Sequence, residues 1–134
     1  MILTNQKLTV NGEAKTTEIY NIDGSNYFKL RDMAALLDGT DAQFSVAFDS
    51  DRNTIVVKTG EAYESVGGEL ATGTDKSSTA VASTQSVEIN GEKANLAAYN
   101  IGGNNFFKLR DLGTALDFDV SYDAETATML VVSK

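Results

Sequence analysis

Hydrophobic and polar residues alternate over short stretches along most of the chain, which is typical of half-buried β-strands. Residues 8–10 alternate and run into Asn11-Gly12, a pair that tolerates positive φ and favours a tight hairpin turn. Further strands are predicted at residues 19–22, 26–30, 44–48 and 54–58. At residues 30–37 the apolar positions instead recur at the spacing of one helical face, which predicts a helix of about two turns.

The same order of elements is predicted twice. Residues 20–33 recur almost unchanged as residues 99–112, and Asn90-Gly91 repeats the first hairpin turn. Such self-similarity indicates an internal repeat, so we predict an α+β protein of two homologous repeats. The repeats are predicted at residues 1–60 and 80–134, with a mostly irregular connecting segment at residues 61–79 that is rich in Gly, Ser and Thr. Units of this size are marginal alone, so we expect them to contact each other, as one compact unit or as two.

Composition narrows the function classes. The chain has 134 residues and a net charge of −8, which disfavours sequence-independent nucleic-acid binding and docking on anionic lipid. There is no His and no Cys, so the commonest general base and the imidazole and thiolate metal ligands are missing. No apolar run approaches the length that crosses a bilayer, and the first residues lack the pattern of a signal peptide. We expect no nucleic-acid partner, no membrane insertion and no cofactor.

The recurring segment resembles a known family. The order of motifs in each copy is similar to that of the copper amine oxidase N-terminal-like domain, also called the stalk domain. These motifs are an Asn-Gly hairpin, Tyr-Asn-Ile-x-Gly-x-Asn followed by Tyr/Phe-Phe-Lys-Leu-Arg-Asp, a short helix and a Phe/Tyr-Asp turn. The resemblance implies that each repeat is a twisted antiparallel β-sheet packed on one short α-helix. It also implies export and an accessory role at the surface of Gram-positive bacteria. It does not imply copper or amine oxidation, which in the oxidases belong to a separate domain with His ligands.

Aromatic residues beside the predicted tight turns are the candidate binding residues. Neighbouring residues of a strand face opposite sides, so we assign Phe28 and Phe107 to the core and Tyr27 and Phe106 outward. Outward rings with Asn neighbours suit stacking on sugar rings or on a partner protein. The alternative is that these rings cover the junction between the repeats. The candidate interaction surface comprises Tyr20, Asn26, Tyr27, Tyr99, Asn105 and Phe106.

Two acidic motifs have both a functional and a structural interpretation. Arg31-Asp32, which recurs as Arg110-Asp111, suits a ligand-binding pair, but an Asp at a predicted helix start more often caps the helix or favours its N-terminal dipole. In that case the Arg lies over the sheet or pairs with a carboxylate such as that of Asp49 or Asp123. Asp49-x-Asp51-x-Asn53 resembles the opening of a calcium loop, yet Thr54 stands where that loop requires Gly. We therefore favour a hairpin turn and predict no metal site.

The sequence therefore predicts a non-catalytic extracellular or cell-surface module for attachment, spacing or assembly of a surface structure. The alternative is a carbohydrate- or cell-wall-binding module that uses exposed aromatic rings. An enzyme acting on cell-wall polymer is a more distant alternative, because the acids fall at turns and caps where they have local roles. The expected partners are a protein or a cell-wall glycan, and free strand edges also allow self-association.

Overall fold

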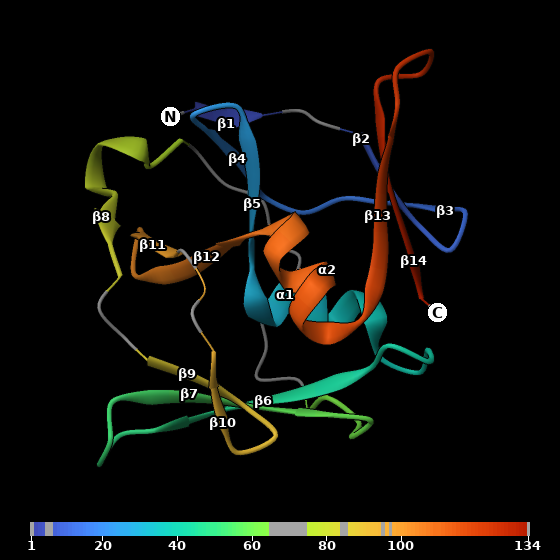
Figure 1. Ribbon diagram of the computed structural model, residues 1–134. Coiled ribbons are helices and arrows are strands. Elements are labelled where there is room, and N and C mark those ends of the chain that lie inside the picture. Colours follow the sequence, from blue (N-terminus) through green and yellow to red (C-terminus); the bar gives the residue numbers. More distant parts are fainter. Residues whose placement is uncertain are drawn as a thin grey trace.

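The computed structural model describes residues 2–4, 7–64, 75–83, 86–94, 96 and 98–133. It is β-rich with two short helices, which confirms the α+β class (Figure 1). Most of the connecting segment predicted at residues 61–79 lies outside the described residues. The strands are β1 (Ile2–Thr4), β2 (Lys7–Val10), β3 (Glu13–Lys15), β4 (Ile19–Ile22), β5 (Ser25–Lys29), β6 (Phe44–Asp49), β7 (Thr54–Thr59), β8 (Val81–Ala82), β9 (Ser86–Ile89), β10 (Glu92–Ala94), β11 (Ala98–Ile101), β12 (Asn104–Lys108), β13 (Phe118–Asp123) and β14 (Thr128–Ser133). The helices are α1 (Leu30–Leu37), α2 (Leu109–Leu116) and the 3₁₀ turn η1 (Ser77–Thr79).

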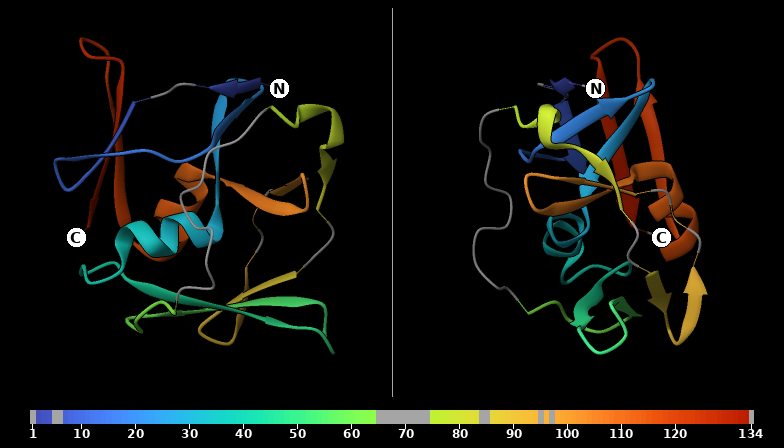
Figure 2. Two further views of the ribbon diagram at one scale, coloured as in Figure 1. Left: turned by 180° about the vertical axis from the view of Figure 1, so that it is seen from behind. Right: turned by 90° about the vertical axis from the view of Figure 1, so that its left-hand side faces the viewer.

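The two halves of the chain meet in a six-stranded antiparallel sheet of order β1-β4-β5-β12-β11-β8. Its two central strands, β5 and β12, come from the two copies of the recurring segment. Phe28 stands directly opposite Phe107, the residue that occupies the same position in the other copy. The helices α1 and α2 follow these strands without a loop and lie in the middle of the molecule, with the sheets around them (Figures 1 and 2).

Two four-stranded sheets complete the fold, one beneath the helices and the other beside them in the view of Figure 1. In each sheet a hairpin from one half joins a hairpin from the other. β2 pairs in parallel with β14, and β9 pairs in parallel with β7. The prediction of a separate antiparallel sheet for each repeat is therefore wrong. Each short hairpin packs its apolar face against the other half and pairs one of its edges with a strand of that half. A unit of this size cannot bury an apolar face and pair its strand edges on its own.

The Asn of each Asn-Gly turn fastens its hairpin to the other half. The Asn11 backbone N–H donates to the Val131 carbonyl at 2.8 Å. The side-chain oxygen of Asn11 accepts a hydrogen bond from the Ser133 backbone N–H at 2.9 Å. Asn90 makes the same pair of bonds, to the Val57 carbonyl at 2.9 Å and from the Thr59 N–H at 3.0 Å. Both Asn residues have positive φ, as the predicted turns require.

Replacing Asn11 by Ala is expected to lower the free energy of unfolding by about 1–2 kcal/mol, because it removes the side-chain acceptor and strains the left-handed backbone. Denaturant unfolding followed by circular dichroism measures the loss. Asn11→Gly is the matched control, since it tolerates the backbone conformation and removes only the side-chain bonds. Equal stability of the Ala variant and the wild type would contradict the role of this contact.

The two helices begin and end largely where the pattern places them. Gly39, at φ +80°, follows the C-cap of α1 as expected, whereas the non-glycine residue Asp117 takes the left-handed position after α2. The prediction that the Asp32 side chain caps α1 is wrong, whereas its alternative place in the first turn, near the N-terminal end of the helix dipole, is confirmed. Lys29 is the N-cap and makes no side-chain capping bond, while Asp32 lies in the first turn, buried, and accepts a 2.5 Å hydrogen bond from the Thr17 hydroxyl.

Candidate functional site

The predicted outward rings are buried. The exposed fractions of Tyr20, Tyr27 and Phe106 are 1%, 5% and 1%, and Tyr99 is half-buried. The assignment of Tyr27 and Phe106 to an open surface is therefore wrong, although Phe28 and Phe107 do lie in the main core as predicted. The physical reason is that the second face of the six-stranded sheet is covered as well, by a small cluster to which Leu3 and Ala80 contribute.

These rings instead join the two halves. Tyr20 meets Phe106 edge to face at a centroid distance of 5.0 Å, and Tyr27 meets Tyr99 at 5.6 Å. The Tyr20 hydroxyl accepts a hydrogen bond of 2.9 Å from the Lys76 backbone N–H. Burial raises the pKa of the Tyr27 phenol above its ordinary value. The ring contacts between the two halves agree with the alternative interpretation, in which these aromatic rings cover the junction between the halves.

The remaining two candidates are Asn26 and Asn105. Both side chains are half-buried and therefore partly accessible at the surface. The Asn26 amide nitrogen donates to the Met129 sulfur at 2.8 Å, and the Asn105 side-chain oxygen accepts from Asn100 at 3.3 Å. Each Asn lines an open groove whose other walls come from the opposite half of the chain. These two grooves are the candidate functional sites.

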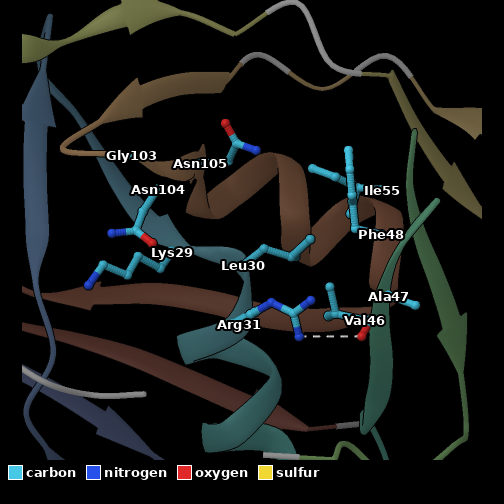
Figure 3. A pocket seen from close by; sticks show the side chains of 10 residues that line it. All are labelled: Lys29, Leu30, Arg31, Val46, Ala47, Phe48, Ile55, Gly103, Asn104 and Asn105. Carbon is cyan, nitrogen blue, oxygen red and sulfur yellow. Dashed lines mark hydrogen bonds between the residues drawn. The ribbon is translucent and has the colours of Figure 1, made fainter. Parts of the chain in front are cut away.

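The first groove has a volume of about 240 Å³ and lies between the start of α1, the strands β6 and β7, and the turn before β12 (Figure 3). The second has a volume of about 390 Å³ and lies between the start of α2, the strands β13 and β14, and the turn before β5. Corresponding residues line both, so Lys29, Leu30 and Arg31 in the first groove are matched in the second by Lys108, Leu109 and Arg110.

Each groove carries one exposed aromatic ring. The exposed fraction is 47% for Phe48 in the first groove and 50% for Tyr122 in the second. The other nine Phe and Tyr side chains of the chain are buried or half-buried. Alternation over the strand predicted at residues 44–48 puts Phe48 on the same side as Phe44, which is buried, so the strand pattern does not indicate an exposed ring. The signal that indicates the two exposed rings is the recurrence of an aromatic residue directly before Asp49 and Asp123.

The charges that line the grooves are all positive. In the first groove, the Lys29 ammonium lies 2.6 Å from the Glu18 carboxylate, which itself lies outside the groove. Arg31 and Arg110 each donate to a backbone carbonyl, that of Val46 or Val120, at 3.4 Å. Arg31 thus lies against β6, and Asp49 pairs with Arg52 instead.

The acidic turn after β6 forms local bonds. One Asp49 carboxylate oxygen accepts the backbone N–H of Asp51 at 3.1 Å, and the other lies 2.7 Å from the Arg52 side chain. The Arg52 guanidinium hydrogen-bonded to Asp49 holds the pKa of that carboxyl below its ordinary value, and it also pairs with Glu88 at 2.5 Å. These contacts give Asp49 the role of a turn residue. Within the described part of the chain, no three His, Cys, Asp or Glu residues gather in a group that suits a metal ion.

No protein-family model, no curated protein and no solved structure matches the chain. Among the described residues, neither helix has the length and apolar character needed to cross a membrane.

Proposed function

We propose that this chain is a non-catalytic extracellular or cell-surface module that attaches a surface structure to the bacterial cell wall. The observation that carries the proposal is the pair of corresponding grooves, each with an exposed ring beside amide and cationic side chains. Aromatic rings that stack on sugars, with polar groups at their edges, are suited to glycan binding. Two sites on one chain also strengthen binding to a repeating polymer by raising the effective concentration.

The sequence and the order of strands in the sheets support the finer parts of this proposal. The recurrence of residues 20–33 as 99–112 supports two homologous repeats of stalk-domain type, and that resemblance supports export and a Gram-positive surface location. The exchanged hairpins support a rigid spacer, since the two halves share all three sheets. Among the described strands, β6 and β13 each stand at the end of a sheet and have one edge that pairs with no other strand, which supports self-association as a second mode of assembly.

A catalytic role finds no support in the grooves, because neither is lined by an Asp or a Glu. The acidic residues of the two sequence motifs accept hydrogen bonds from other groups of the chain instead. Asp32 accepts from Thr17, and Asp123 accepts from the backbone of its own turn at 3.0 Å. We therefore propose binding without turnover.

Co-sedimentation with a purified Gram-positive cell-wall preparation tests the proposal. The variant Phe48→Ala/Tyr122→Ala is expected to bind at least about tenfold more weakly than the wild type, because each groove loses its stacking surface. The matched control is Val81→Ala/Val132→Ala, which removes exposed apolar side chains that line neither groove. Failure of the folded wild type to sediment with the wall, or equal binding by the two double variants, would refute the proposal.

A further inference from the structure

We propose that the groove around Lys108, Arg110 and Tyr122 binds an acidic unit of a polysaccharide, one that carries a carboxylate or a phosphate group. This inference rests on the proposed function and names the chemistry of its ligand. In this site the Tyr122 ring stacks on the sugar ring, and the two cationic side chains bind the anionic group. The groove around Lys29 binds the same unit more weakly.

The distribution of charge on the chain favours an anionic ligand in the grooves. The chain has 19 acidic and 11 basic residues, so most of its charged side chains are negative. A surface groove lined by basic residues and by no acidic residue therefore differs in charge from the chain as a whole. Four of the basic residues line the two grooves, and no acidic residue does. Asp23 and Asp111, which neighbour groove residues in sequence, are not among the lining residues. The acids in the lining of an adjoining hollow, which Arg110 also borders, are Asp117 and Asp119. Such local positive charge on an acidic protein favours an anionic ligand at these two places.

The two grooves differ in how their cationic side chains are paired. Lys29 is neutralised by Glu18 at 2.6 Å, whereas Lys108 and Arg110 make no ion pair within the described part of the chain. Alanine stands at the position of the second copy that corresponds to Glu18 in the sequence. The second groove therefore offers two cations with hydrogen-bond donors still available, and the first offers one. A charge-assisted bond to a carboxylate or phosphate is about twice as strong as a neutral one, so the second groove is the better anion site.

The size and the walls of the second groove also suit a saccharide. Its volume of about 390 Å³ lies at the small end of the range for small-molecule sites, roughly 300–1,000 Å³, and fits a short saccharide segment. Tyr122, half exposed, lies in the wall contributed by β13, and Asn26 comes from the opposite half of the chain. The site is therefore complete only when the hairpin of β4 and β5 is paired with β12.

Isothermal titration calorimetry with three defined probes tests this inference. The probes are a galacturonic acid oligomer, a glycerol phosphate oligomer and a neutral chito-oligosaccharide. The wild type is expected to bind at least one acidic probe at least about tenfold more tightly than the neutral probe, and more weakly as salt rises. The acidic probe that binds identifies carboxylate or phosphate as the recognised group.

Variants locate the binding. Lys108→Gln/Arg110→Gln is expected to lose at least about tenfold in affinity for the acidic probe. Lys58→Gln/Lys93→Gln is the matched control, because it changes the net charge equally at exposed lysines outside both grooves. Arg110→Lys keeps the charge and is expected to bind within about threefold of the wild type, which separates charge from folding defects.

Three outcomes overturn the inference. They are equal binding of neutral and acidic probes, equal losses in the two Gln variants, and no binding of any probe by a protein that still sediments with the wall. All three leave the proposed attachment function standing, because that function depends on sedimentation and on the Phe48→Ala/Tyr122→Ala comparison. Loss of sedimentation itself contradicts the attachment function.

Discussion

Replacing Phe107 by Ala is expected to lower the free energy of unfolding by about 3–5 kcal/mol, the usual cost of a large cavity in a packed core. The Phe107 side chain is 1% exposed and stands opposite Phe28 on the two central strands of the six-stranded sheet. Both rings belong to the main hydrophobic core, to which both helices contribute. Urea unfolding, followed by circular dichroism and Tyr fluorescence, measures the change.

Phe48→Ala is the matched control for this prediction. It removes the same side chain from a residue that is 47% exposed, so the expected loss is below about 1 kcal/mol. The Phe107→Ala variant should also unfold in a single transition, because strands of both halves share each sheet. A loss confined to one of two separate transitions would contradict the shared core.

Replacing Lys29 by Met is expected to lower the free energy of unfolding by about 3 kcal/mol, because the Glu18 carboxylate then remains buried without its partner. The Lys29 ammonium lies 2.6 Å from that carboxylate, and the side chains are 16% and 8% exposed. The ammonium also lies 5.8 Å from the centre of the Phe106 ring, a contact that adds a smaller cation–π contribution. Thermal and urea unfolding at neutral pH measure the loss.

The chain supplies its own control for this ion pair. Lys108 holds the corresponding position and makes no ion pair within the described residues, so Lys108→Met should change stability by no more than about 0.5 kcal/mol. The double variant Glu18→Ala/Lys29→Met should regain most of the loss, because no uncompensated charge is left. Equal destabilisation by Lys29→Met and Lys108→Met would show that side-chain packing, and not the ion pair, matters here.

Local elements were predictable because their causes are local. The Asn11-Gly12 and Asn90-Gly91 turns follow from residues that tolerate positive φ, and α1 follows from the spacing of its apolar residues. The inward position of Phe28 follows from strand alternation. The role of Asp32 was not predictable in the same way, because its carboxylate accepts a hydrogen bond from the Thr17 hydroxyl, fifteen residues away in the sequence.

The candidate site was predicted only in part. Asn26 and Asn105 do line the grooves, but Tyr27 and Phe106 are buried and the exposed rings are Phe48 and Tyr122. Alternation shows that neighbouring residues face opposite sides of a strand, but it does not show whether both sides are covered. That depends on segments far apart in sequence, such as the residues around Ala80.

The sequence by itself determined the strands, the turns, the helices and the recurrence of one segment, because each depends on backbone preferences and periodicity within a few residues. Only the tertiary structure decided that β2 joins β14 and that β9 joins β7. Any hairpin with a free edge and an apolar face satisfies the same local rules, so its partner is selected by the packing of the whole chain. Both grooves depend on that packing, because each takes walls from both halves.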